Sequence, residues 1–371
     1  MVEKKLFNRG IASGEAFCNR TEELERLVKN IDKLTHSLLV SPRRYGKTSL
    51  ALRAIARSGL PYAHIDLFMK CDATSVVAEF FQGMGSLTSK IIKPNELALR
   101  KLESLLKNLS VSLSLGEFGF EFNLTPKNID SQKNIKSLLI SIDEILLKNK
   151  KQAIIFIDEI QAIIGTEIGD EVESALRFVA QKTNNIIFIF SGSSRHLLGK
   201  IFDDRSRPLY KLCHKMAIHR ISVDHYKTFI NKFAKIVWKQ PISDSVLDEI
   251  FSCTQLHTYY INILCGYLFE LDNLPTEGDV ITCWKRVCSE EQSSVAKEIE
   301  FLTLKQKQLL NEIAKHPGLK EPTAKSFVKN VNLTPKGVSG AIDVLLKHDL
   351  IEKLETGVIR IVDPVLDYWS K

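Results

Sequence analysis

Short apolar runs alternate with longer amphipathic stretches along the first 222 residues of the chain. Residues 153–157 and 186–190 are apolar at every position, as buried parallel strands are. Apolar residues at helical spacing, such as Leu24, Leu27 and Val28, fill the stretches between such runs. Strands that alternate with helices predict a parallel α/β sheet. The predicted strands are 36–40, 62–68, 153–157, 186–190 and 216–221. One helix is predicted to begin at residue 21, a second to follow the strand at 36–40 and end at about residue 57, and a third to span about 169–182.

Residues 85–150 interrupt this alternation and are predicted to form an insertion. A helix rich in Lys and Leu is expected over 93–108, and another over 131–148. Between them, residues 111–115 and 120–124 flank Gly116 and Gly119, which is typical of a β-hairpin. The sheet domain is therefore expected to span 1–222, with this insertion inside it as a candidate partner surface.

The remainder of the chain is predicted to form two smaller domains. Residues 223–300 have a purely helical pattern, which predicts a helical lid. Residues 301–371 predict three helices and a two-stranded wing over 354–362, with a helix-turn-helix formed by 321–330 and 336–348. This pattern is typical of a winged-helix domain. Its second helix is expected to present Lys336, Ser339, Gly340 and Asp343 outward and to bury Val338, Ile342, Leu345 and Leu346.

Composition excludes fibrous, low-complexity and membrane-spanning classes of protein. Hydrophobic residues make up 44% and charged residues 26% of the chain, close to the averages for globular proteins. No run of 18 apolar residues occurs, and residues 1–6 lack the apolar core of a secretory signal. The seven cysteines form no CxxC pair, so we expect reduced thiols and a cytoplasmic protein without membrane contact. The net charge of +7 permits phosphate-bearing partners but does not require them.

The clearest chemical signal is the loop between the strand at 36–40 and the next helix. Gly46 would let backbone N–H groups approach a phosphate, Lys47 would reach the β- and γ-phosphates, and Thr48 would offer its hydroxyl to Mg²⁺. The alternative is a chance Gly-Lys-Thr on a surface turn. The full pattern starts with Gly, where this chain has a serine with less access to positive φ. The residues expected to bind nucleotide are Ser41, Pro42, Arg43, Arg44, Tyr45, Gly46, Lys47, Thr48 and Ser49.

A pair of carboxylates follows the apolar strand at 153–157. Asp158 and Glu159 would emerge at the carboxyl end of the sheet, where open α/β sheets bind their ligands. There Asp158 is expected to hold Mg²⁺, usually through water, and Glu159 to orient or deprotonate the attacking water. Such a pair is common by itself, but the Lys47 loop about 110 residues upstream strengthens its interpretation as part of a nucleotide site.

Two weaker signals lie near the same edge of the sheet. Ser191 or Ser193, at the end of the strand at 186–190, could contact the γ-phosphate or its water; an ordinary Gly/Ser turn is the alternative. Arg205 or Arg207 could stabilise charge in the transition state as an arginine finger, and solvation at the surface is the alternative.

These elements together resemble the archaeal-type ATPases of the STAND branch of AAA+-related P-loop NTPases. The resemblance implies a P-loop (ASCE/AAA+-like) sheet domain that binds ATP and Mg²⁺, a helical lid and a C-terminal winged helix. It also implies Phe17 and Arg20 near the adenine, and His257 in the lid near the phosphates. The segments that carry it are Phe17-Cys18-Asn19-Arg20, Pro42-Arg43-Arg44 with Gly46-Lys47-Thr48, Phe156-Ile157-Asp158-Glu159-Ile160-Gln161, Ser191-Gly192-Ser193-Ser194, Pro208-Leu209-Tyr210 and Asp363-Pro364-Val365-Leu366-Asp367-Tyr368-Trp369.

The chain departs from the family pattern at three places that bear on hydrolysis. Asn19 stands for the glycine of Phe-x-Gly-Arg, and Asn tolerates a left-handed backbone best among the other residues. Lys211-Leu212 stand where an arginine usually follows Pro-Leu-Tyr-Gly, which moves the finger role to Arg205 or Arg207, or abolishes it. Leu256-His257-Thr258 replaces Gly-His-Pro in the lid.

The sequence therefore predicts an ATPase that acts as a nucleotide-driven molecular switch. ATP would lie between the Lys47 loop and the lid, closure of residues 223–371 would be the output, and slow hydrolysis would reset it. Two alternatives stay open: a DNA-binding ATPase, such as an origin-recognition-like regulator or loader, and a nucleotide-binding interaction protein without useful hydrolysis. The partner would be an unknown protein, a second copy of the chain, or DNA. Residues 301–371 carry 11 Lys or Arg against 8 Asp or Glu, which is little charge for DNA binding.

Overall fold

The computed structural model describes residues 7, 9–70, 72–95, 111–116, 119–124 and 131–371. They form two compact units. Of these described residues, the ones within 21–41 and 47–218 make up the sheet unit, and the ones within 7–20, 42–46 and 219–371 make up the helical unit. The loop segment 42–46 therefore belongs to the helical unit, although Ser41 and Lys47 on either side of it belong to the sheet unit.

Five parallel strands form the centre of the sheet unit, in the order β2-β5-β6-β1-β7. This confirms the predicted parallel α/β sheet. The last strand lies earlier than the predicted 216–221, because the chain passes into the helical unit at His219. The strands are β1 Ser37–Val40, β2 Tyr62–Asp66, β5 Ala153–Asp158, β6 Ile186–Gly192 and β7 His214–Ala217.

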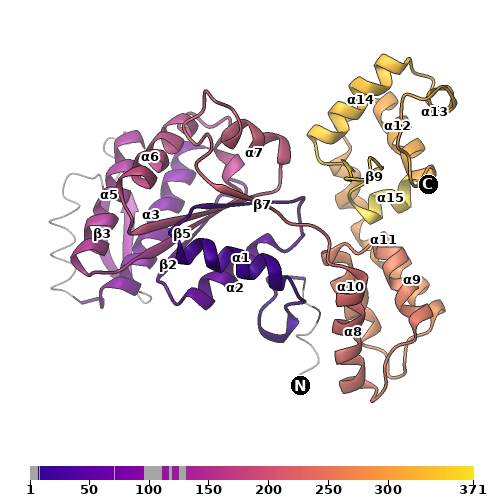
Figure 1. Cartoon of the computed structure of the whole chain (residues 1–371), viewed down its shortest axis with the longest axis horizontal. Helices are drawn as coiled ribbons and strands as arrows, with labels where there is room; N and C mark the ends of the chain where they lie inside the picture. Colours follow the sequence, from indigo (N-terminus) through magenta and orange to yellow (C-terminus); the bar gives the residue numbers. More distant parts are fainter. Residues whose placement is uncertain (1–6, 8, 71, 96–110, 117–118, 125–130) are drawn as a thin grey trace. The chain divides into compact units, whose positions relative to one another are not determined.

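Helices cover both faces of this sheet (Figure 1). On one face α1 (Thr21–Asp32) packs against α2 (Lys47–Ser58). The other face is covered by α3 (Ala73–Ile91), α5 (Ser131–Lys148), α6 (Gly169–Lys182) and α7 (Arg195–Phe202). All six residues of β5 are buried, which explains why the five residues before Asp158 are apolar without alternation.

The helix α3 continues past residue 85, where the insertion was predicted to begin. Glycine is unfavourable inside helices, yet α3 contains Gly83 and Gly85. A Cβ atom at Gly85 would lie 2.7 Å from the Phe120 carbonyl oxygen, so the glycine allows β4 to approach the helix closely. The packing that this approach permits offsets the unfavourable helix propensity.

The predicted hairpin of the insertion is confirmed. β3 (Val111–Gly116) pairs antiparallel with β4 (Gly119–Leu124), and α5 covers the predicted 131–148. Of the helix expected over 93–108, residues 93–95 are not helical and the rest lies outside the described residues.

The helical unit contains a helical region and a winged helix. The first wing strand lies before the predicted 354–362, the second lies within it, and the two flank residues 354–358. Val338, Ile342 and Leu345 are buried as predicted, Leu346 is half-buried, and the four residues predicted to face outward are exposed. The elements are α8 Val223–Val237, α9 Asp244–Thr254, α10 Thr258–Leu268, α11 Glu277–Glu298, α12 Leu304–Lys315, α13 Lys325–Val331, α14 Pro335–Lys347, β8 Ile351–Lys353, β9 Ile359–Ile361 and α15 Pro364–Ser370, with short 3-10 turns at Gly14–Ala16 in this unit and Ile160–Ile163 in the sheet unit.

One hydrophobic core runs through the helical region and the winged helix. The last helix, α15, packs along α11, and Trp369 Nε1 donates to the Cys288 carbonyl at 3.1 Å. Tyr260 Oη donates to Asp363 Oδ2 at 2.7 Å, and burial raises the pKa of that carboxyl. The winged helix is therefore docked on the helical region of its own unit.

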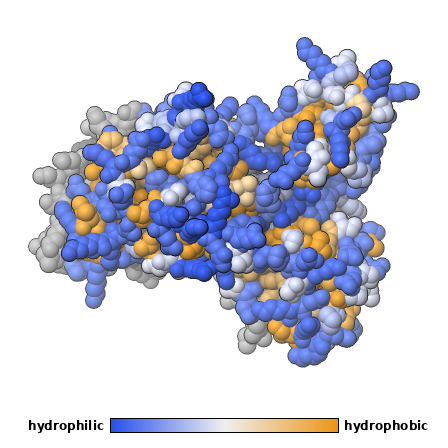
Figure 2. All heavy atoms as spheres, in the orientation of Figure 1, coloured by the Kyte–Doolittle hydropathy of each residue, from blue (hydrophilic) through white to orange (hydrophobic). Residues whose placement is uncertain are grey.

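Polar and charged residues make up most of the visible surface of each unit (Figure 2). No helix within the described residues is long and apolar enough to cross a bilayer. The cysteines that the structure describes are all free thiols, and burial raises the pKa of Cys18 to about 12.

Candidate functional site

The loop between β1 and α2 has the backbone that a phosphate-binding loop needs. Gly46 has φ 87° and Arg44 has φ 63°, so two residues of the loop are in the left-handed region. No atom lies within 4 Å of a Cβ built on Gly46, which means that conformation rather than space requires glycine there. Ser41 does not have a positive φ, so serine at the first position of the loop brings no backbone strain.

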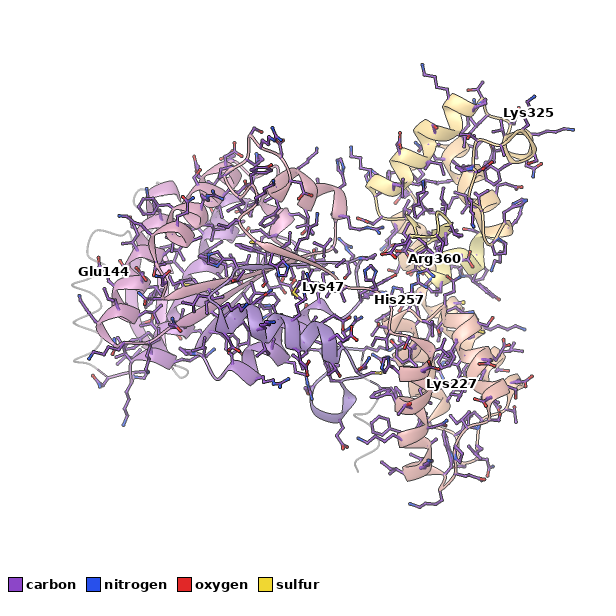
Figure 3. All side chains as sticks on the ribbon, in the orientation of Figure 1. Lys47, Glu144, Lys227, His257, Lys325 and Arg360 are labelled. Atoms are coloured by element: carbon purple, nitrogen blue, oxygen red, sulfur yellow. The ribbon has the colours of Figure 1, made fainter. Side chains whose placement is uncertain are left out.

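Lys47 is the first residue of α2, where Figure 3 labels it. Its side chain is only 5% exposed, and its Nζ donates to the Ser41 carbonyl at 3.1 Å. Helix N-termini attract anions because their first N–H groups have no partners within the helix. The ammonium group and the start of α2 thus provide two features of an anion site. In the same segment Pro42 and Ser49 are buried, whereas Arg43 is exposed.

The Asp158 carboxylate accepts hydrogen bonds from a residue of α2 and from a residue of β6. Thr48 Oγ1 donates to Asp158 Oδ2 at 2.5 Å, and the Ser191 hydroxyl donates to Oδ1. The three oxygen-bearing groups come from α2, β5 and β6, which meet at the carboxyl edge of the sheet. Tertiary structure therefore brings together Thr48, Asp158 and Ser191, as the sequence predicts for a ligand site at this edge.

The donor set at Asp158 fits Mg²⁺. Carboxylate and hydroxyl oxygens are the ligands that this ion takes, and it usually retains several waters. In the parts of the chain that the structure describes, no group of three or more His, Cys, Asp or Glu side chains is placed to hold a metal ion. If Mg²⁺ binds here, Thr48 and Asp158 are the residues that would hold it, together with water and phosphate oxygens.

Glu159 is held in place by the strand next to its own. It has φ 53° and ψ 43°, a left-handed conformation that is uncommon for glutamate. Its Oε2 accepts from Ser193 Oγ at 2.7 Å, from Ser193 N at 3.2 Å and from Gln161 Nε2. All three of these donors bind Oε2, which leaves Glu159 Oε1 as the oxygen that a water could contact.

Two residues at this edge were missed by the sequence analysis as site residues. Gln161 donates to Glu159, and a Cβ on Gly192 would lie 2.2 Å from Gln161 Oε1, so a larger residue there would displace the Gln161 side chain. His64 on β2 stacks on Phe156, and its Nε2 lies 4.0 Å from Asp158 Oδ2. In both cases the sequence feature that could have indicated the residue is a polar side chain among apolar neighbours.

The two arginines considered for the finger role have different environments. Arg207 contacts Asp170 at 2.6 Å and also contacts Glu173, whose side chain is fully buried. The hydrogen bond to Glu173 raises the pKa of Arg207, while burial raises the pKa of Glu173 against the opposing effect of Arg207. Arg205 is exposed. Arg207 is thus a partner of carboxylates within the sheet unit, one of them buried.

We expect Arg207→Ala to lower the free energy of unfolding by about 3 kcal/mol, because it leaves the Glu173 carboxylate buried without its partner. Urea denaturation of the full chain measures this loss. The matched control is Arg205→Ala, which removes an exposed guanidinium nearby and should change stability by less than about 0.5 kcal/mol. A stable Arg207→Ala that had lost only phosphate release would instead favour an arginine finger.

The remaining predicted residues lie in the helical unit. Arg20 is buried with φ 63°, and its guanidinium donates to the carbonyls of Tyr45 at 2.8 Å and His219 at 3.0 Å. His257 is buried at the start of α10, and burial lowers the pKa of its imidazole well below the usual value. Phe17 is half-buried. Their roles toward a nucleotide stay predictions.

Two family models match the chain. The first, an ATPase domain predominantly from Archaea, matches residues 17–263, and the second, a probable winged-helix domain, matches residues 296–371. The second match agrees with the predicted and observed winged helix. No curated protein matches the chain.

Solved structures show the same fold at low sequence identity. A Walker-type ATPase of Pyrococcus abyssi is 18% identical with a TM-score of 0.72, and the match covers 98% of this chain and 99% of that chain. The ORC2 protein of Aeropyrum pernix, in ADPNP-ADP complexes, is 13% identical with a TM-score of 0.59 over 99% and 97% of the two chains. These likenesses establish an α/β P-loop core followed by a helical region and a winged helix. Because the archaeal model spans more than half of the residues, including the Lys47 loop and the Asp158 strand, the chain belongs to the family of ATPase domains found predominantly in Archaea.

Proposed function

We propose that the chain binds ATP with Mg²⁺ and hydrolyses it slowly, as a nucleotide-driven molecular switch of the STAND type. The observation that carries this proposal is the 2.5 Å hydrogen bond between Thr48 and Asp158, which joins the start of α2 to the end of β5. In this proposal Lys47 binds the β- and γ-phosphates, and Thr48 and Asp158 hold the metal ion.

Glu159 is the proposed base or orienting group for the attacking water. The support is its restrained carboxylate, which has one oxygen in three hydrogen bonds and the other available. Slow turnover follows from the lack of an arginine after Pro208-Leu209-Tyr210 and from the engagement of Arg207 with Asp170 and the buried Glu173. Of the two candidate finger residues, the exposed Arg205 is then the one we retain.

The proposal is tested by equilibrium binding of ATP and by phosphate release, each with Mg²⁺ and with EDTA. We expect ATP binding that is tighter with Mg²⁺ and phosphate release that depends on Mg²⁺. Binding without any phosphate release would support the alternative of a nucleotide-gated interaction protein. No binding of ATP or ADP in either condition would overturn the proposed function.

The winged helix carries a second candidate function, contact with duplex DNA. Lys320, Lys325 and Lys329 are exposed on α13 and on the segment before it, where Figure 3 labels Lys325. Exposed lysines close together in sequence are suited to phosphate contacts that carry no sequence information. The outward residues of α14 include only one lysine, Lys336, beside Asp343.

We expect any DNA binding to be weak and non-specific and to fall steeply with salt. Titration of a fluorescent duplex at several salt concentrations gives the slope of log affinity against log salt. Lys325→Glu combined with Lys329→Glu should reduce that slope by about two, because each lysine would neutralise one phosphate of the duplex. A parent protein that shows no salt-dependent binding to the duplex would rule this second function out.

A further inference from the structure

Two consecutive residues of the nucleotide loop are held by side chains of the helical unit. Arg44 donates to Glu291 Oε2 at 3.2 Å and lies over the ring of Tyr259 at 4.0 Å. Tyr45 is 2% exposed, and its ring meets the ring of His257 edge to face at 5.0 Å. Arg44 has a positive φ, which persists only where the surroundings determine the backbone. These contacts restrain the segment within the helical unit.

Arg220 connects Tyr45 to the winged helix. Its Nε donates to Tyr45 Oη at 2.9 Å, and its Nη2 donates to the Val362 carbonyl at 2.7 Å. Val362 lies between the wing strand β9 and α15. A third nitrogen, Nη1, donates to the Gln255 carbonyl between α9 and α10. One planar guanidinium therefore has partners on the loop, the helical region and the winged helix.

A charged partner on the wing completes this group. Glu352 on β8 lies 3.8 Å from Arg220 Nη2 and accepts from Arg360 of β9, a residue that Figure 3 labels, at 2.9 Å. The Arg220 side chain is 7% exposed. A buried guanidinium that loses a partner must find another acceptor, because an unpaired buried charge is strongly unfavourable. Removal of the wing would thus change the position of Arg220 and, with it, the hydrogen bond to Tyr45.

We propose that Arg220 is a positioning residue that makes the conformation of the nucleotide loop depend on docking of the winged helix. This inference rests on the proposed function, since it assumes that the loop binds nucleotide. Coupling of this kind is reciprocal: a nucleotide that requires a different loop conformation weakens the docking, and undocking changes the affinity for nucleotide. The Tyr45 hydroxyl is the link, because it joins Arg220 to the residue that precedes Gly46-Lys47.

The test compares two Tyr→Phe variants of the full chain. Tyr45→Phe removes the hydroxyl that meets Arg220, whereas Tyr226→Phe removes an equally buried hydroxyl that contacts Thr258 in the helical region. Affinities for mant-ADP and mant-ATP with Mg²⁺ are measured for both variants and the parent. We expect the Kd of Tyr45→Phe to rise about five-fold for at least one nucleotide, as loss of one hydrogen bond allows, and that of Tyr226→Phe to match the parent.

Hydrogen exchange provides a readout that a purely structural role would not change. In the parent, saturating nucleotide should alter amide exchange over 350–366, and in Tyr45→Phe this response should be lost at equal occupancy. Tyr45→Phe with parental affinities and a parental exchange response would overturn the coupling while the proposed function stands. If the parent binds neither nucleotide, the proposed function fails, and the coupling fails with it.

Discussion

Lys47→Ala is expected to weaken ATP binding by at least about 100-fold. The lost group is a cation that would make charge-assisted hydrogen bonds to two phosphates, each of which contributes about 1.5–3 kcal/mol. Its position supports this expectation, since Lys47 is buried at the first residue of α2 and its Nζ lies within the loop, 3.1 Å from the Ser41 carbonyl. Isothermal titration calorimetry with Mg²⁺-ATP measures the change.

The control for this experiment is Lys29→Ala, which removes an exposed lysine in the last turn of α1. It should bind ATP like the parent. Thermal unfolding without nucleotide checks that both variants are folded. If Lys47→Ala bound ATP with parental affinity, the assignment of the loop to phosphate binding would be wrong.

Glu159→Gln is expected to keep ATP binding and to reduce phosphate release by about 100-fold or more, the usual contribution of a general base. The substitution preserves shape, so Ser193 can still donate to the remaining carbonyl oxygen, while the side chain loses the ability to accept a proton. Single-turnover phosphate release at saturating Mg²⁺-ATP separates this effect on chemistry from any effect on binding.

Glu167→Gln serves as the matched control, because Glu167 is an exposed glutamate in the segment before α6. Its phosphate release should equal that of the parent. Parental turnover by Glu159→Gln would assign the role of the base to another group. A loss of ATP binding in the same variant would instead place Glu159 in nucleotide binding rather than in catalysis.

For the serines at the end of β6, the structure shows hydrogen-bond acceptors that the sequence could not identify. From the sequence, Ser191 or Ser193 was expected to contact the γ-phosphate or its water. In the structure each hydroxyl donates to a carboxylate, Ser191 to Asp158 and Ser193 to Glu159. The sequence could place both serines at the correct edge, because parallel strands end together, but it could not select the acceptor of each hydroxyl.

Local pattern was sufficient for the fold and for picking out the segments that form the candidate site. Apolar runs and helical periodicity predicted the parallel sheet, the hairpin of the insertion, the helical region and the winged helix. The β1–α2 loop and the carboxylates at the end of β5 could also be identified, since each is a contiguous segment whose chemistry depends on neighbours in sequence.

The partners of buried charged side chains were decided by tertiary structure alone. The sequence offered a solvated residue or a finger for Arg207 and could not name its partner Glu173, 34 residues away. Arg220, which no motif marked, contacts Tyr45 at a separation of 175 residues. Local periodicity determines which face of an element is buried, and it contains no information on which distant side chain lies opposite. That depends on strand order, on register and on the packing of separate segments into one core, which exist only once the chain has folded.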